Sequence, residues 1–229
     1  NGSNTAIGWS TLKNLNAGAE GYNTAVGYDA GRNVTTGLKN TLIGSFAGNY
    51  TSTADSSTFI GYNAGLGISG TQLTGDDNTA VGRNTGALLQ GAANSNTLVG
   101  AYAGDALTTG SNNVAVGFES LSTEDAHGNN IAIGNRALKT LNAGAAGLNV
   151  AIGDDAGLAM TSGIQNTLVG GLAGDALEDA DANVAIGKGA LTTDRLGSYS
   201  VAVGFAALEA QIFTSATNSY NTAVGAAAG

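Results

Sequence analysis

A five-residue phrase, first met at Asn4-Thr5-Ala6-Ile7-Gly8, recurs along the whole chain. It occurs in 13 copies, each starting 17 to 21 residues after the one before. A period this short and this persistent is the signature of a solenoid, in which each repeat forms one coil stacked on the next. We number the positions of each coil from its first Asn or Ser, which is position zero. The copies begin at Asn4, Asn23, Asn40, Ser57, Asn78, Asn96, Asn113, Asn130, Asn149, Asn166, Asn183, Ser200 and Asn221.

The columns formed by equivalent positions favour β-structure. Position one is Thr, Val or Ile, position three is Val or Ile, and position four is Gly in every copy. β-Branched residues are typical of strands, and stacked coils would pair their strands in parallel at ~4.8 Å. The sequence therefore predicts an all-β chain, a parallel β-solenoid (β-roll or β-helix) of about 13 coils with a 17–21-residue repeat. We expect residues 1–229 to form a single repeat domain and to be a piece of a longer fibrous protein, because the repeat reaches both ends.

The direction of the side chains follows from the alternation of a strand. Residues two apart share one face, so we expect positions one and three to point into the coil and position two to point outward. Position two is mostly Ala, with Leu or Phe in four copies. An exposed stripe of this kind indicates an interaction surface. We therefore predict an interface between copies of the chain through Ala25, Leu42, Phe59, Leu98 and Leu168.

Other columns describe the rest of the coil. Position seven is Ala, Ser or Thr, position eight is always Gly or Leu, and position eleven is apolar in most coils, where we expect a second inward residue. Four polar residues interrupt position eleven, and the pattern does not explain them: Thr51, Glu124, Asp194 and Gln211. Insertions lie at 15–21, 68–76, 141–147 and 211–219, and the stretches 12–31 and 138–157 are near duplicates.

The composition argues against several classes of protein. The net charge is −9 with only 8 Lys and Arg, so no basic surface exists to neutralise phosphates, and we expect no nucleic-acid partner. Gly is abundant, at 37 of 229 residues, and no Cys is present for disulfides or thiol chemistry. No apolar run reaches the ~18 residues of a membrane-spanning helix, so we expect no membrane insertion.

Few residues suggest chemistry. His127 is the only His and has no second His or Cys nearby in the sequence, as a metal site or catalytic triad would need. Adjacent carboxylates such as Asp154 and Asp155 would point to opposite faces of a strand rather than face each other. The sequence predicts no catalytic, cofactor-binding or metal-binding residues, no cofactor, and a protein that is not an enzyme.

Two columns of side chains are candidates for binding, one to glycans and one to ordered water. Aromatic residues near position five could stack on sugar rings or pack over the Gly of a neighbouring coil. They are our candidate glycan contacts: Trp9, Tyr28, Tyr62, Tyr102, Phe118 and Phe205. Thr recurs at position one, as in solenoids that order water against ice. Val or Ile replaces it in later coils, which we interpret as the tolerance of an inward position.

The phrase resembles the head repeats of trimeric autotransporter adhesins, written N-S-V-A-I-G-x-x-S/A. The copy at Ser200-Val201-Ala202-Val203-Gly204-Phe205-Ala206-Ala207 is the closest to that pattern. The longer form, as in 23–40, is similar to repeat arrays of phage tail-fibre proteins that carry an endosialidase-type chaperone domain. The resemblance implies a left-handed parallel β-roll that trimerises and an adhesive or fibre-forming role.

From the repeat and the resemblance we expect a non-enzymatic structural and adhesive rod. It would be the shaft or head of a homotrimeric extracellular fibre, on a virion or a bacterial cell surface, with a host-surface glycan or protein receptor as partner. The alternative is a single-chain solenoid that polymerises end to end into an extracellular filament. Coils without polar caps support the alternative, because they leave strand edges open.

Overall fold

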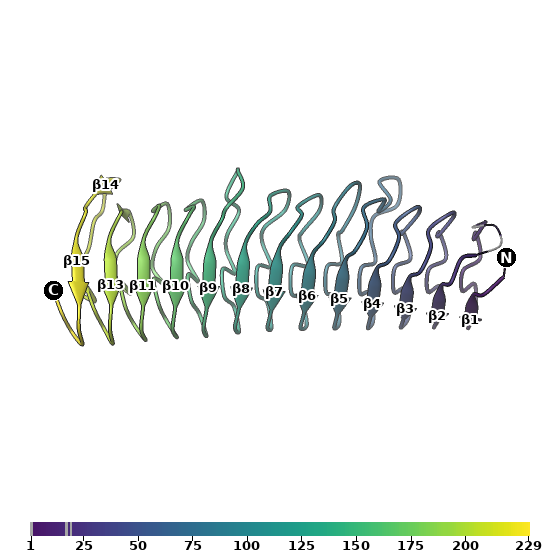
Figure 1. Ribbon diagram of the computed structural model, residues 1–229, viewed down its shortest axis with the longest axis horizontal. Helices are drawn as coiled ribbons and strands as arrows, with labels where there is room; N and C mark the ends of the chain where they lie inside the picture. The colour runs from purple at the N-terminus through teal and green to yellow at the C-terminus, as the bar shows by residue number, and fades with distance from the viewer. Residues whose placement is uncertain (1, 17, 19) are drawn as a thin grey trace. The chain divides into compact units, whose positions relative to one another are not determined.

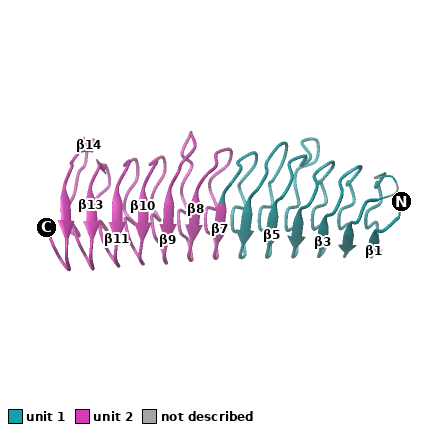
Figure 2. Ribbon diagram, in the orientation of Figure 1, with its two compact units in different colours: residues 1–113 teal, residues 114–229 magenta. Residues whose placement is uncertain are grey.

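The computed structural model describes residues 2–16, 18 and 20–229. Two compact units make up the chain, residues 1–113 and 114–229, and each is described by itself (Figure 2). The expectation of a single repeat domain over 1–229 stays a prediction. None of the described residues belongs to a helix. The described part of the chain therefore contains no helix that could cross a membrane.

Short strands are the regular secondary structure of both units (Figure 1). Unit 1 contains β1 (Thr5–Ile7), β2 (Thr24–Val26), β3 (Thr41–Ile43), β4 (Thr58–Ile60), β5 (Thr79–Val81) and β6 (Thr97–Val99). Unit 2 contains β7 (Val114–Val116), β8 (Ile131–Ile133), β9 (Val150–Ile152), β10 (Thr167–Val169), β11 (Val184–Ile186), β12 (Gly197–Ser198), β13 (Val201–Val203), β14 (Thr217–Asn218) and β15 (Thr222–Val224).

Each phrase forms one strand from position one to position three, and neighbouring strands pair in parallel and in register. In unit 1 the order is β1 to β6, with Leu42 of β3 opposite Phe59 of β4. In unit 2 the order is β7-β8-β9-β10-β11-β13-β15, and β12 pairs with β14 in a second small sheet. The prediction of an all-β parallel β-solenoid with about 13 coils and a repeat of about 17 residues is therefore confirmed.

The predicted direction of the strand side chains is wrong. Position two points into the coil: Ala25, Leu42 and Phe59 are all 0% exposed. Positions one and three are half-buried or exposed in every strand. The physical reason is that only the middle residue of a three-residue strand faces the narrow interior, which positions seven, eight and eleven also fill. Position eleven does point inward as predicted, for example at Val34 and Met160.

The core is packed by complementary sizes at positions two and eight. Wherever position two is Leu or Phe, position eight is Gly both in the same coil and in the preceding one. A Cβ added to Gly157 would lie 2.9 Å from Leu168 Cδ1 and 2.8 Å from Leu138 Cδ2. Where position eight is Leu, as at Leu138, position two is Ala. Large side chains thus fill the space above neighbouring glycines, which keeps the thin interior close-packed.

A buried ladder of Asn side chains joins successive coils at position zero. The Oδ1 of Asn149 accepts a hydrogen bond from the backbone N–H of Asn166 at 3.0 Å, and Asn166 repeats this toward Asn183 at 3.0 Å. The Nδ2 of Asn166 donates to the carbonyl of Ala180 at 2.7 Å. Asn23 makes the equivalent contacts in unit 1. This amide ladder satisfies backbone groups that the core would otherwise bury unpaired.

The polar residues at position eleven lie at the longer coils, and hydrogen bonds explain three of them: Glu124, Asp194 and Gln211. The buried Thr51 hydroxyl has no hydrogen-bond partner among the described residues. Thr51, Glu124 and Asp194 each lie in the coil that precedes one with an insertion, and Gln211 lies in the last such coil. Asp194 is fully buried and accepts hydrogen bonds from the Phe213 backbone at 3.0 Å and from Gln211 Nε2 at 2.6 Å. An inserted loop brings extra N–H groups against the coil below it, and a buried acceptor satisfies them.

Candidate functional site

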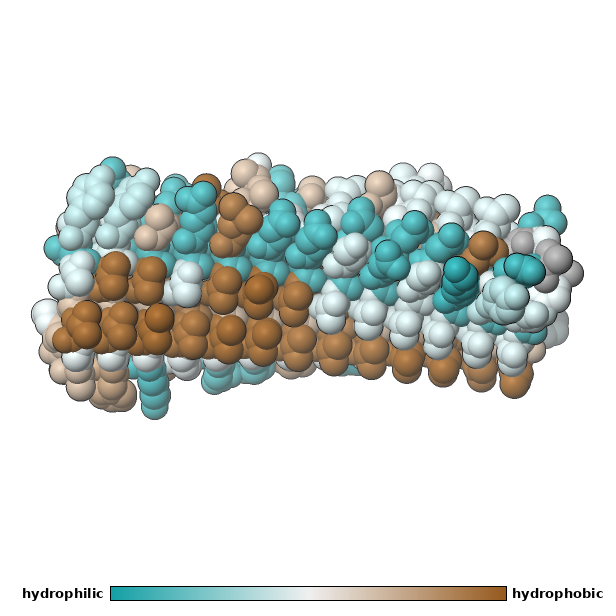
Figure 3. Space-filling model, in the orientation of Figure 1, coloured by the Kyte–Doolittle hydropathy of each residue, from teal (hydrophilic) through white to brown (hydrophobic). Residues whose placement is uncertain are grey.

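The outward side of the strands forms a regular surface on each unit. We call the residues at positions one and three of the strands the sheet face. In unit 1 position one is always Thr, beside Ile or Val at position three. In unit 2 position one is Val or Ile in five of its seven coils, so two apolar columns run side by side. Figure 3 shows position three as a brown row in both units, and position one as a second brown row, interrupted by Thr, in unit 2 only.

The sheet face is uncharged, and its position-three column is apolar in both units. No coil has a charged residue at position one or three. Ile43 and Ile152 are each 37% exposed within their sheets, and Ile7 and Val224 are 60% and 70% exposed. Contiguous apolar surface of this kind marks an interaction site rather than an ordinary solvated strand face.

The predicted interface residues do not belong to this surface. Ala25, Leu42, Phe59, Leu98 and Leu168 are each 0% exposed inside their own coils, and so they cannot contact another copy. The predicted outward column at position two is therefore wrong, and the outward residues are those at positions one and three. The pairing of large residues at position two with Gly at position eight was the sequence signal that could have shown this.

The candidate glycan contacts lie on the surface of both units. Trp9, Tyr28, Tyr62, Phe118 and Phe205 are between 46% and 72% exposed, and Tyr102 is half-buried. In unit 1, Phe46 connects two of them: its ring lies 5.3 Å from that of Tyr28 and 6.3 Å from that of Tyr62, both edge to face. The Arg83 guanidinium lies 4.5 Å from the ring centre of Tyr102. Unit 1 therefore has an aromatic row, in which sequence reasoning missed Phe46.

Comparisons with protein-family models, curated proteins and solved structures were made for the whole chain. None of them matches.

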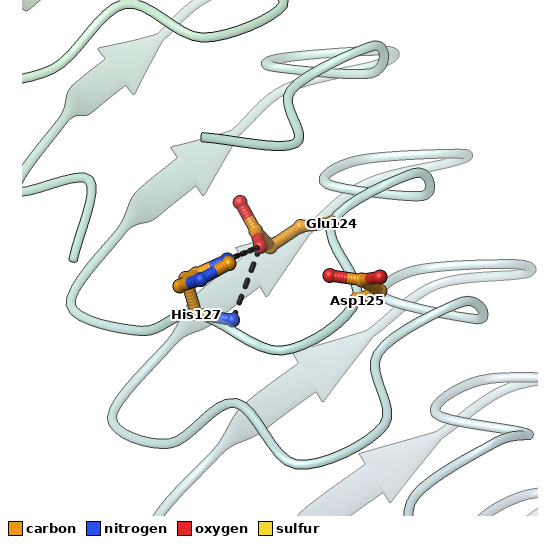
Figure 4. A group of neighbouring side chains, drawn as sticks. All are labelled: Glu124, Asp125 and His127. Carbon is orange, nitrogen blue, oxygen red and sulfur yellow. Dashed lines mark hydrogen bonds and ion pairs between the residues drawn. The ribbon is translucent and has the colours of Figure 1, made fainter. Parts of the chain in front are cut away.

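A second candidate site is formed by Glu124, Asp125 and His127 in unit 2. One ligand atom from each lies within 4.8 Å of the others, so together they could offer a divalent cation one nitrogen and two oxygens. Figure 4 shows the His127 ring beside the Glu124 carboxylate, with Nδ1 at 3.1 Å from Oε1. Glu124 is fully buried, and His127 is partly exposed. Sequence reasoning had set His127 aside because it has no His or Cys neighbour.

The contacts of Glu124 match those of Asp194, a buried carboxylate that has no His beside it. Glu124 accepts hydrogen bonds from the backbone of His127 at 3.1 Å and of Ala143 at 3.2 Å. Asp194 accepts hydrogen bonds from the backbone of Gly197 at 3.2 Å and of Phe213 at 3.0 Å. For both carboxylates the two donors lie three and nineteen residues later in the chain. The same role at both places supports a structural acceptor under an inserted loop. The geometry of Glu124 is thus explained without a metal ion.

Asp175, on the surface of unit 2, predicts a dependence of stability on pH. Burial raises the pKa of its carboxyl above the usual 3.8, although Thr192 donates a hydrogen bond to it, which opposes the rise. A raised folded-state pKa means that the folded chain binds the proton more tightly than the unfolded chain. The contribution of Asp175 is therefore most favourable at low pH and is lost as pH rises through its folded pKa.

We therefore expect Asp175→Asn to raise the midpoint of thermal unfolding slightly at pH 7 and to leave it unchanged near pH 3. The amide keeps an acceptor for Thr192 but has no charge to desolvate. Thermal melts followed by circular dichroism at the two pH values provide the measurement. A midpoint that falls at pH 7 would contradict the prediction. Asp179→Asn, at an exposed position in the same coil, is the matched control.

Proposed function

We propose that this chain is a non-enzymatic structural and adhesive component of an extracellular fibre, assembled from three copies that pack through the sheet face. The fibre would be a phage tail fibre or a bacterial surface adhesin. The observation that carries the proposal is the unbroken Ile and Val column at position three of every coil, half-buried or exposed within each unit. A single chain leaves this column in water.

A second copy of the chain fits this surface better than an unrelated partner does. The column repeats at the strand spacing of ~4.8 Å, and another copy carries a column of the same period. Each copy has a net charge of −9, but the sheet face itself holds no charge, so copies can approach there without like charges being buried. The resemblance to trimeric adhesin heads supports three copies rather than two.

The mass of the chain in solution tests the assembly. Light scattering at micromolar concentration is expected to give three times the mass of one 22.3 kDa chain. A stable monomer would contradict the proposal. A mass that grows steadily with concentration would instead support the end-to-end filament.

Substitutions locate the interface. Ile133 and Ile152 are register partners at position three of β8 and β9. We expect Ile133→Asp with Ile152→Asp to give monomers, because each trimer would bury six unpaired carboxylates. The circular dichroism of the monomer should stay unchanged, since both side chains point away from the core. Ile212→Asp, at a 59% exposed residue in an inserted loop, is the control and should remain trimeric. Trimers formed by the double variant would show that the interface lies elsewhere.

The Thr column of unit 1 favours a second function, the ordering of surface water. Position one points outward, so the interpretation of its Val and Ile as the tolerance of an inward position is wrong. Six Thr stand in register beside Ile or Val on parallel strands. An assay of ice recrystallisation with residues 1–229 tests the idea, with Thr41→Lys and Thr58→Lys as disrupting changes. Inhibition of ice growth that these changes abolish would support this function, and no inhibition would exclude it.

A further inference from the structure

A groove of about 560 Å³ crosses three successive coils of unit 1, those that begin at Asn23, Asn40 and Ser57. Its volume lies within the range of roughly 300–1,000 Å³ that is usual for small-ligand sites. It lies apart from the sheet face, because its lining comes from positions six, nine and ten of the coils. The groove is lined mainly by Asp29, Arg32, Asn33, Phe46, Asn49 and Tyr50.

Two aromatic rings contribute flat apolar surface to the groove. Phe46 and Tyr50 are both half-buried, so part of each side chain reaches solvent. The edge-to-face contacts of Phe46 with Tyr28 and Tyr62 hold its ring in place. A ring that is fixed before binding loses little conformational entropy when a ligand packs on it.

The amide groups of the groove are held in a fixed direction. Asn14 donates to Asn33 at 3.0 Å, Asn33 donates to Asn49 at 3.0 Å, and Asn49 donates to the carbonyl of Asp29 at 3.0 Å. Each amide oxygen can accept a second hydrogen bond, and each amide nitrogen has a second N–H. This row therefore offers both donors and acceptors beside the two rings.

Asp29 is a buried charged group of the groove. The residue is 5% exposed, and its Oδ2 lies 3.3 Å from Nη1 of Arg32. Its Oδ1 is buried and has no hydrogen-bond partner among the described residues. The equivalent Oδ1 of Asp155 in unit 2 is also buried without a hydrogen-bond partner among the described residues, so this acceptor is a feature of the coil and does not by itself indicate a ligand. The pair with Arg32 leaves this part of the groove without net charge.

The equivalent coils of unit 2 show that the fold does not require these side chains. Residues 126 positions later occupy the same places in three coils of unit 2. There Leu172 occupies the position equivalent to Phe46, Ala176 that of Tyr50 and Ala159 that of Asn33. Phe46 and Leu172 even share the same left-handed backbone, with φ of 61° and 59°. The coil is built equally well without the rings and amides, so their gathering in unit 1 calls for another explanation.

We propose that this groove binds a neutral glycan. Phe46 and Tyr50 stack against the apolar face of a sugar ring, whose hydroxyls exchange hydrogen bonds with Asn33 and Asn49. Rings beside fixed amides and one paired carboxylate match a ligand that is apolar on one face and rich in hydroxyls at its edge. Of the candidate glycan contacts, Tyr28 and Tyr62 support the site through Phe46. The groove is separate from the proposed trimer interface, so either proposal can fail alone.

Saturation-transfer NMR and calorimetry on the whole chain test the site with four probes: maltotriose, mannotriose, triacetylchitotriose and sialyllactose. We expect binding of at least one of the three neutral oligosaccharides. Phe46→Leu and Tyr50→Ala, which install the residues of unit 2, should each weaken that binding about tenfold or more. Phe205→Leu, at an exposed ring of unit 2, should leave it unchanged. Thermal melts should show that all three variants keep the fold.

Four outcomes would overturn the proposal. They are no binding of any neutral probe, binding of sialyllactose alone, equal affinity in Phe46→Leu and Tyr50→Ala, and an equal loss in Phe205→Leu. The last would mean that sugars stick to exposed rings in general. The mass of Phe46→Leu in light scattering should equal that of the unchanged chain, which separates glycan binding from assembly.

Discussion

Replacing Gly153 by Ala is expected to lower the free energy of unfolding of unit 2 by more than about 4 kcal/mol, or to prevent folding. Gly153 follows β9 at position four with φ of 143°, a region that is essentially restricted to Gly and costs other residues about 1–3 kcal/mol. The added Cβ would also lie 2.5 Å from the backbone carbon of Gly170 in the next coil. Neither coil can yield, because the Gly170 N–H is bonded to the Ile152 carbonyl at 2.7 Å.

Gly144→Ala provides the matched control in the same unit. Gly144 also has a positive φ, of 66°, but a Cβ there would have no atom within 4 Å. We expect a loss of about 1 kcal/mol, the usual cost of a left-handed backbone for a residue with a side chain. Urea unfolding followed by circular dichroism compares the two variants. Equal midpoints for Gly153→Ala and Gly144→Ala would show that the contact between coils is not the cause.

Asn166→Ala is expected to have the second largest effect, a loss of about 2–6 kcal/mol. The change leaves the Asn183 N–H and the Ala180 carbonyl buried without partners, at about 1–3 kcal/mol each. It also removes the contact between Asn166 Nδ2 and Asn149 Oδ1, at 3.2 Å. The same urea titration gives the magnitude.

The chain itself supplies the control for this prediction. Ser stands at position zero in two coils, and the Ser57 hydroxyl accepts a hydrogen bond from the Asn78 backbone at 3.3 Å. Asn166→Ser should therefore keep one of the two backbone contacts and lose about half as much stability as Asn166→Ala. If the serine and alanine variants unfold at the same urea concentration, the acceptor at this position contributes nothing measurable.

The strand positions and their parallel stacking could be predicted from the sequence because the period itself encodes them. Val or Ile followed by an invariant Gly places one short strand and one corner in each coil. The Asn ladder could be foreseen too, since stacked amides at a fixed spacing bond to each other. These features are local, or they follow from translation of one coil onto the next.

The face of the strand could not be read from residue type. Val and Ile at positions one and three suggested a core, while Ala at position two suggested a surface. The structure has the opposite arrangement, because a coil this thin has room for Ala, or for one Leu above two glycines, as at Leu168. The inward side was therefore set by volume, which couples residues of different coils, and not by hydrophobicity.

The candidate sites were predictable only in part. The aromatic residues near position five are exposed as a group, but the groove depends on residues at positions six, nine and ten of three coils. Asn33, Asn49 and Phe46 are unremarkable in the sequence and meet only when the coils stack. Glu124 and Asp194 were visible as exceptions, yet their role as acceptors required knowledge of which loop lies against them.

Because core residues of complementary size pack between neighbouring coils, a given coil can be followed only by certain others. A Leu at position two leans over the Gly of the coil before it, whereas a Leu at position eight, such as Leu138, leans over the Gly of the coil after it. If the single coil 149–165 were excised, Leu168 would meet Leu138 where Gly157 now separates them. A gene for such a chain can therefore lengthen or shorten safely only by copying or losing compatible blocks of coils. The near duplicates at 12–31 and 138–157 are the trace that block copying would leave.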